Sequence, residues 1–557
     1  MQSLGKKLII ITVVLALLGI GGFFGRKAYK KTVERRLVRE TKEYLEQKNW
    51  RGASLTLRRS LQLNPHNLEA SKMMADLMEA SGSPVALDWR VRVVELDPGS
   101  SEYRMDWART AVRLRDFTAA SNALSGLSSS ARTNVTYHKL MGGLELALSR
   151  PEKAESHYAE ALRLEPTNQL TLINLATVRL GSTNLTQAAE ARGILKSLVT
   201  NKATRPMALT RLRADALYRQ STNEAIGYSR ELVNEAEISI DEKMDHLRLL
   251  SRAGSPEEKP FLENLKEQAT KSSAIAYSVG RWITIKQSPA AALAWLKSLP
   301  PETSSTEPVP QVMADCLILM KNWPGLLALL ESGNWGESEF YRLGLTAMAQ
   351  RTMGETVAAE SSWRKAMRLS TRRLDRLTRL SKVAEAAGMT EERLRVLQEI
   401  TESFPKERWA GEKLAQHFYA AGDTKAIHHV LSKIHSSNPA DPSLKNSLAY
   451  IRLLLRTDME NAHRMAKEAY QTAPEDSAVI TTYAYSLFLN GNGAEAVELL
   501  KKLNPESLKN PRTATCYTVI NAHTGDKVAA KNFLKKVDGM QMLPEEREIL
   551  SQASAHL

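Results

Sequence analysis

Cysteine is nearly absent from this sequence, since its 557 residues contain only Cys316 and Cys516. No CxxC pair exists, so structural zinc, iron–sulfur and thioredoxin-like chemistry lack the ligand spacing that they need. Two thiols so far apart in the chain are expected to be reduced and buried, because free cysteine behaves as a small hydrophobic residue. The sequence therefore predicts neither a disulfide framework nor a cysteine-based metal site.

Aromatic residues are also scarce, at 6% of the chain, and runs of alternating β-branched residues are hard to find. This composition disfavours strands and suits helices. The motifs GxxxxGK[ST], HExxH, GxSxG and HRD are all missing, so phosphate-cradle, metalloprotease, hydrolase and kinase chemistry have no candidate site. His428, His429 and His435 lie close in sequence, but adjacent side chains on a helix diverge too far to bind one ion. We expect no enzymatic activity, no cofactor and no metal.

The excess of positive charge is concentrated at the N-terminus. The formal net charge is +14, yet residues 1–42 hold ten Lys or Arg and only two Glu. The remaining 515 residues are therefore only mildly basic. A nucleic-acid partner is disfavoured by this distribution, although a basic solenoid that binds nucleic acid stays an alternative because the pI is about 9.5.

Long hydrophobic runs are absent except for one, at residues 8–25, which carries no charge. Its length fits a membrane-spanning helix, and Lys6, Lys7, Arg26 and Lys27 flank it. More Lys and Arg follow it than precede it, which places the rest of the chain on the cytoplasmic face. An extracytoplasmic location and a cleaved signal peptide are the alternatives, although no clear A-x-A cleavage site is present.

An internal repeat is the most informative feature of the sequence that follows the N-terminal segment. Two segments share one spacing pattern. A small residue is followed by a large residue four positions later, by a second small residue three positions after that, and by proline five positions further on. The first segment has Ala53, Leu57, Ser60 and Pro65, and the second has Ala154, Tyr158, Ala161 and Pro166. Spacings of four and three mark one helix face, and the proline stops the helix. The same frame recurs at Ala359, Trp363 and Ala366, and at Ala462, Ala466, Ala469 and Pro474.

A preceding helix contributes Gly142, where two helices must cross closely. This combination resembles the tetratricopeptide repeat, a 34-residue helix–turn–helix unit. The resemblance implies an all-α, right-handed superhelical solenoid of about fifteen hairpins, here with one N-terminal transmembrane helix. Trp50, Phe117, Tyr158 and Trp363 are expected in its core.

The resemblance also limits the function. Chaperone-binding members carry a clamp of Lys and Asn, whereas this chain has Val38, Lys42 and Met73 at the corresponding places. The anchor-plus-repeats layout is similar to that of bacterial membrane-bound tetratricopeptide proteins that tune lipopolysaccharide synthesis. Those proteins end in a cysteine-rich metal-binding module, which this chain lacks.

The chain is expected to divide as follows: a tail (1–7), the anchor (8–25), a basic juxtamembrane segment (26–36), an N-terminal array (37–237), degenerate repeats (238–336) with a proline-rich loop (300–310), a C-terminal array (337–544) and a tail (545–557).

First helices of such arrays line the inner surface, where partners bind. The candidate partner-binding residues are these positions: Arg109, Arg113, Lys139, Arg211, Met348, Trp409, Tyr419, Tyr485 and Phe488. Large exposed apolar groups there favour a bound peptide or helix. The leading hypothesis is a membrane-tethered scaffold that binds protein or peptide partners in its groove, in an envelope-associated assembly. An exported repeat protein of polysaccharide or envelope biogenesis is a further alternative, and the oligomeric state is left open.

Overall fold

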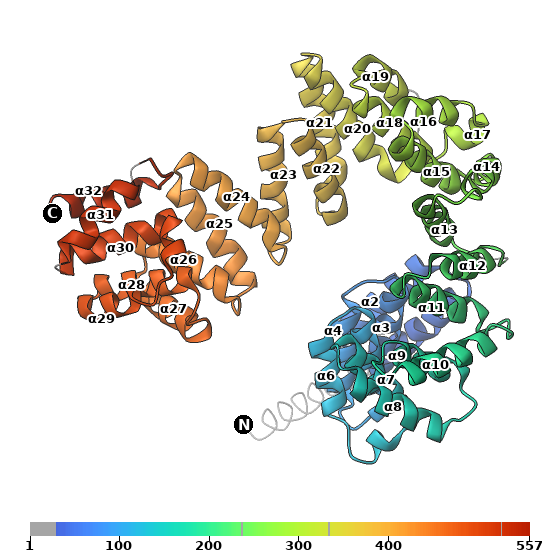
Figure 1. Cartoon of the computed structure of the whole chain (residues 1–557). Coiled ribbons are helices and arrows are strands. Elements are labelled where there is room, and N and C mark those ends of the chain that lie inside the picture. The colour runs from blue at the N-terminus through green and yellow to red at the C-terminus, as the bar shows by residue number, and fades with distance from the viewer. Residues whose placement is uncertain (1–28, 236–237, 332–334, 525, 538) are drawn as a thin grey trace, which may run out of the picture. The chain divides into compact units, whose positions relative to one another are not determined.

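The structure is a computed structural model that describes residues 29–557 apart from 236–237, 332–334, 525 and 538. All regular secondary structure in these residues is helical (Figure 1). The all-α prediction is thereby confirmed for this part of the chain. The chain forms two compact units, which divide within one helix, between Phe261 and Leu262.

The described part of the first unit starts with a helical stretch over residues 29–46. Its further helices are α2 (Trp50–Leu63), α3 (Leu68–Ala80), α4 (Ala86–Leu96), α5 (Ser101–Arg113), α6 (Phe117–Ser125), α7 (Val135–Ala147), α8 (Pro151–Leu164), α9 (Gln169–Leu180), α10 (Leu185–Leu198), α11 (Arg205–Tyr218), α12 (Thr222–Val233) and α13 (Ile240–Ala253).

The second unit begins within α14. Its helices are α14 (Glu258–Ala269), α15 (Ser273–Lys286), α16 (Pro289–Lys297), α17 (Pro301–Ser304), α18 (Val309–Leu319), α19 (Trp323–Glu331), α20 (Glu339–Thr352), α21 (Thr356–Ser370), α22 (Leu374–Ala386), α23 (Thr390–Ser403), α24 (Arg408–Ala421), α25 (Thr424–Ser437), α26 (Pro442–Leu455), α27 (Met459–Thr472), α28 (Ser477–Leu489), α29 (Gly493–Leu500), α30 (Pro511–Thr524), α31 (Lys527–Val537) and α32 (Pro544–Ser554).

Consecutive helices pack in pairs, each a first helix followed by a second helix. In the first unit the pairs run from α3 with α4 to α11 with α12, and in the second from α15 with α16 to α30 with α31. The repeat frame explains the pairing, because its small residues are buried at the crossings: Ala154 and Ala161 on α8, and Ala359 and Ala366 on α21, are all at most 1% exposed. The predicted helix–turn–helix hairpins are confirmed.

The prediction of which aromatic residues lie in the core is only partly correct. Tyr158 and Trp363 are buried as expected, whereas Trp50 is 54% exposed at the first position of α2. Trp50 precedes the buried face of its helix, which begins at Ala53. Both cysteines are free and buried, as predicted.

Most turns inside a hairpin contain a residue in the left-handed conformation, although the turns from α9 to α10 and from α15 to α16 do not. Glycine supplies it at Gly354, Gly388, Gly422 and Gly491. At other hairpins a residue with a side chain takes the same conformation: Lys48, Arg115, Ser149, Gln220, Lys321 and Arg456. The recurring turn therefore keeps its shape even where glycine, the residue that favours it, is missing.

Two expected irregular segments are helical. The proline-rich stretch 300–310, predicted to be a loop, contains the single turn α17 and the start of α18, with Thr303 and Val309 buried. The predicted tail, residues 545–557, forms most of α32, on which Glu546, Leu550 and Ala553 are buried. Prolines caused the first error, since all four of them lie at helix N-termini, where a missing N–H does no harm.

None of the described helices combines the length and the apolar character that crossing a membrane requires. The predicted anchor at residues 8–25, and the tail before it, lie outside the described residues.

Candidate functional site

Two neighbouring cavities lie along the first helices α15, α18, α20 and α22 of the second unit. The larger has a volume of about 530 Å³ and the smaller about 310 Å³, and Asp315 and Ile318 line both. Tyr341, Met348 and Arg379 also line the larger cavity, and Arg281 lines the smaller. We call this pair of cavities the Asp315 site.

Asp315 is the one charged residue of α18, whose sequence is VPQVMADCLIL. Its neighbours Ala314 and Cys316 are fully buried, so the helix holds the carboxylate at the edge of an apolar core. Burial raises the pKa of the Asp315 carboxyl, and the charges of Arg281 and Arg379 oppose this shift. In the part of the chain that the structure describes, no hydrogen bond or ion pair reaches this carboxylate. The site thus presents an acceptor that is partly removed from water and has no donor.

The two arginines near Asp315 are held by other groups. Arg379 stacks on Tyr341, with Cζ 3.8 Å from the ring centroid, and its Nη2 donates to Oε1 of Gln311 at 2.6 Å. Arg281 lies over Tyr277, with Cζ 5.7 Å from that ring centroid. A ring and an amide hold the Arg379 guanidinium group, and the Arg281 side chain is exposed, so neither arginine neutralises Asp315 by direct contact.

Large apolar side chains are exposed at the smaller cavity. Ile285 is 76% exposed and Leu319 is 61% exposed, and both line it. Single exposed apolar residues are ordinary, but here two lie beside an unpaired carboxylate and two cavities. The arrangement suits a ligand that has apolar side chains and one hydrogen-bond donor between them.

The basic residues predicted to line the first unit's inner surface are mostly engaged within the chain. Arg109 pairs with Asp106 at 2.5 Å, Arg113 with Glu79 at 2.7 Å, and Lys139 with Glu165 at 2.6 Å. The fourth residue, Arg211, is exposed on α11. The structure brings these four residues to no shared cavity among those that it describes.

The apolar residues predicted for the second unit are less exposed than expected. Met348 is 5% exposed but still lines the larger cavity, and Tyr485 is 1% exposed. Trp409, Tyr419 and Phe488 are half-buried. The expectation that Tyr485 lies free on a groove is wrong, because the C-terminal residues fold back into its hydrophobic cluster. Whether any of these residues binds a partner stays a prediction.

Sequence reasoning missed Asp315, Tyr341 and Arg379. A usable signal existed for Asp315, since one carboxylate interrupts an otherwise apolar helix face. No such signal marked Tyr341 or Arg379, whose stacking joins α20 to α22. Within the described residues, no group of three or more His, Cys, Asp or Glu is arranged to hold a metal ion.

No family model matches the chain, and no curated protein matches it. Several solved structures are similar over part or most of the chain. The complex of Naa15 and Naa10 bound to HypK-THB gives 12% identity and a TM-score of 0.36, covering 94% of this chain and 96% of that one. The Cut9–Hcn1 hetero-tetramer of the APC/C gives 14% identity and a TM-score of 0.27, covering 82% and 96%.

A third similar structure is PilF of Pseudomonas aeruginosa, at 14% identity and a TM-score of 0.31, covering 39% of this chain and 99% of that one. At such values these structures assign neither a family nor a function, and the fold assignment rests on the hairpins described above.

Proposed function

We propose that the protein is a membrane-tethered scaffold that holds a protein partner at the Asp315 site. The observation that carries this proposal is the half-buried Asp315 carboxylate, which lacks a donor and lies between two cavities edged by exposed Ile285 and Leu319. A peptide segment offers both requirements together, namely apolar side chains for the cavities and a donor for the carboxylate. Repeat arrays of this kind commonly use first-helix faces in this way.

A carboxylate without a donor destabilises the folded state, so a purely structural role for Asp315 is a poor explanation. If Asp315 serves binding, removing its charge should weaken the partner's binding while leaving the fold as stable or more stable. A structural role would have the opposite result. This difference separates the two explanations.

The test uses a photo-crosslinking amino acid at position 319 of the full chain, in cells that contain the partner. The control places it at Leu185, which is 80% exposed on α10 of the other unit. We expect one dominant protein adduct from position 319 only, and about a tenfold weaker interaction in Asp315→Asn, as expected for one hydrogen bond to a charged group. Glu263→Gln, which removes an exposed carboxylate on α14 that is already paired with Lys266, should bind normally. Equal adducts at both positions, or normal binding by Asp315→Asn, would refute the proposal.

The tether is supported by the sequence alone, through residues 8–25 and their basic flank. We expect the full chain to stay with membranes after carbonate washing and to retain these residues, with the repeats on the cytoplasmic face. A mature protein that begins near residues 23–26 would instead establish a cleaved signal peptide. Protease added to spheroplasts should leave the repeats intact, and their digestion would favour the extracytoplasmic alternative.

Nucleic-acid binding is a weaker candidate. Three of the four predicted basic residues already have carboxylate partners, which lowers the free positive charge of that surface. Strongly salt-dependent binding of nucleic acid would restore this alternative.

A further inference from the structure

The C-terminal residues lie against first helices that are far away in sequence. The Tyr419 hydroxyl on α24 donates to the carbonyl of Gln541 at 3.2 Å, and Gln541 Nε2 donates to the carbonyl of Ala420 at 3.1 Å. Thr424 and Glu545 are joined by a further hydrogen bond. The following helix, α32, packs on α30 and α26. One short segment therefore contacts α24, α26 and α30.

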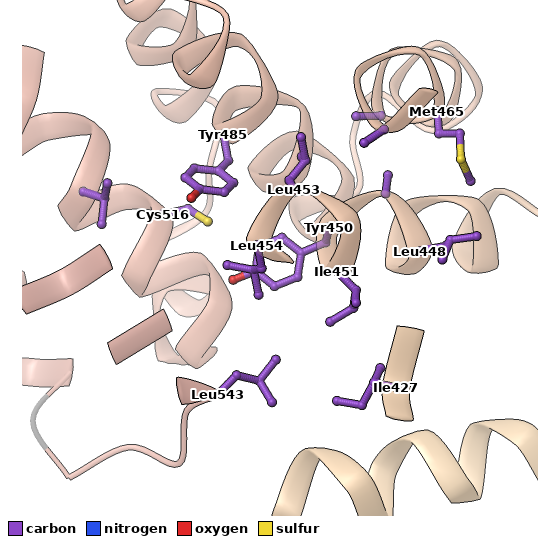
Figure 2. Packing of buried hydrophobic residues seen from close by; sticks show 14 of the residues in the cluster. Ile427, Leu448, Tyr450, Ile451, Leu453, Leu454, Met465, Tyr485, Cys516 and Leu543 are labelled. Carbon is purple, nitrogen blue, oxygen red and sulfur yellow. The ribbon is translucent and has the colours of Figure 1, made fainter. Parts of the chain in front are cut away.

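The face that α32 covers is formed by first-helix residues, which we call the C-terminal docking face: Tyr419, Tyr450, Tyr485, Arg512 and Cys516. Tyr450, Tyr485 and Cys516 are at most 1% exposed and belong to one hydrophobic cluster with Leu543 (Figure 2). Arg512 lies over Tyr450, with Cζ 4.0 Å from the ring centroid.

Glu546 is the unusual member of α32, because it is a carboxylate that is 0% exposed. Tyr450 donates to its Oε1 at 2.6 Å, and the one hydroxyl hydrogen of Tyr419 is shared between its Oε2, at 3.3 Å, and the Gln541 carbonyl. The backbone N–H of Leu543 also donates to Oε2, at 2.8 Å. Two hydroxyl groups from two different helices thus form a receptor for one carboxylate.

A helix that merely seals an apolar surface does not require this charge. Burying a carboxylate has a desolvation cost of several kcal/mol, and an apolar side chain of similar size often gives equal or greater stability. The receptor instead fixes the register of the helix, since only one position places a carboxylate between the two tyrosines. This is the property that a binding site needs for selectivity.

The rest of α32 is also built like a docked ligand. Its buried positions are Leu543, Glu546, Leu550 and Ala553, with spacings of three, four and three that define one helix face. Arg547, Glu548, Ser551 and Gln552 on the other side are exposed.

We propose that the C-terminal docking face binds an amphipathic helix of a partner protein, and that α32 is the internal helix which this partner replaces. The partner helix carries a glutamate in its first turn, an apolar residue three positions earlier, another four positions later and a small residue seven positions later. The face is separate from the Asp315 site, so each proposal can fail without the other.

The test uses the full chain with a protease cleavage sequence inserted between Gly539 and Met540. After cleavage, a fluorescent peptide of residues 540–557 is added, and its anisotropy is measured. We expect saturable binding as the labelled peptide replaces the cut segment. A peptide with Glu546→Gln should bind at least about tenfold more weakly, because a hydrogen-bonded charge is lost. The control peptide, Glu548→Gln, changes an exposed glutamate and should bind like the wild type.

A second measurement keeps the chain uncut. Hydrogen exchange of the α32 amides should become about tenfold faster in Tyr450→Phe, while exchange in α22 is unchanged. The control variant is Tyr470→Phe, whose hydroxyl accepts from Lys502 away from α32. The proposal is overturned if the cleaved chain unfolds, if the cut segment never exchanges, or if the Glu546→Gln peptide binds as tightly as the wild type.

Discussion

Gly142 on α7 lies against the ring of Tyr158 on α8 so closely that a Cβ atom at Gly142 would be 2.7 Å from Cε1 of Tyr158. Tyr158 is itself only 4% exposed, so its ring has little room to move. The hairpin crossing therefore requires glycine at this position for reasons of space, and not for backbone freedom.

We predict that Gly142→Ala destabilises the first unit by about 1–3 kcal/mol, because the tyrosine or the helix must shift. The control is Gly193→Ala on α10, where no atom lies within 4 Å of the new Cβ. That change should stabilise the protein by up to about 1 kcal/mol, since alanine favours helix more than glycine does. Urea unfolding followed by circular dichroism measures both. Equal effects of the two substitutions would show that the close packing at Gly142 does not govern stability.

Enlarging the small residues of the repeat frame should have a similar effect. Ala154→Leu and Ala359→Leu place a larger side chain into fully packed crossings and should each destabilise by about 1–3 kcal/mol. The control, Ala189→Leu, adds the same side chain to an exposed position of α10 and should change stability by less than about 0.5 kcal/mol. Melting curves of the three variants check this, and an unchanged midpoint for both buried sites would mean that the repeat register is misassigned.

The left-handed turn residues offer a stabilising change. Arg115, Ser149 and Gln220 have φ near +60°, a conformation that is unfavourable for residues with a Cβ atom. Exchanging each for glycine should stabilise the protein by about 0.5–1 kcal/mol, after allowance for the greater freedom of glycine in the unfolded chain. The reverse change, Gly354→Ala at φ +85°, should destabilise it. Thermal unfolding of the triple glycine variant measures the sum, and a fall in its midpoint would contradict the strain argument.

His246 should make the stability of the first unit depend on pH. Burial lowers the pKa of His246 to about 4, its Nδ1 has no hydrogen-bond partner, and its ring packs edge-on against Phe261 at 4.8 Å. The pKa of histidine in the unfolded chain is near 6.5. Between pH 6.5 and pH 4, the unfolded chain therefore binds a proton at His246 that the folded chain does not bind. Stability is therefore retained above pH 6.5 and falls as the pH decreases toward 4, by at most about 3 kcal/mol.

Hydrogen exchange of the α13 amides between pH 7 and pH 4.5, corrected for intrinsic rates, measures this effect. His246→Gln should remove most of the dependence, whereas His66→Gln, which changes an exposed histidine between α2 and α3, should leave it in place. A wild-type stability that is flat over this range would rule out the effect.

Local regularities were predictable, and contacts distant in sequence were not. The frame of Ala154, Tyr158 and Ala161 repeats along the chain, so its buried face could be read directly from spacing. Tyr485 occupies an inner-helix position by the same frame, but its burial depends on a cluster that includes Leu543, 58 residues further on. Nothing in the local sequence of α28 records that contact. Glu546 resembled a surface charge for the same reason, because both tyrosines that bind it lie about a hundred residues earlier.

Asp315 falls between these cases. Its position in an apolar helix could have been noticed, but its importance depends on Arg379 of α22 being held by the Tyr341 ring of α20. The sequence contains this arginine and this tyrosine without showing that they meet. The stacking of Arg379 on Tyr341, between two helices, is thus the part of the candidate site that only the structure reveals.

The position of α32 has a consequence for how the protein is made. Hairpins of a repeat array can form one after another as the chain leaves the ribosome. The residues that cover Tyr419 and Tyr450 are, however, synthesised about a hundred residues later, so these side chains stay uncovered while the intervening chain is made. During that interval a chaperone or a partner already present can reach the C-terminal docking face before the chain's own helix does, and the order of synthesis thereby gives the outside ligand the first opportunity to bind.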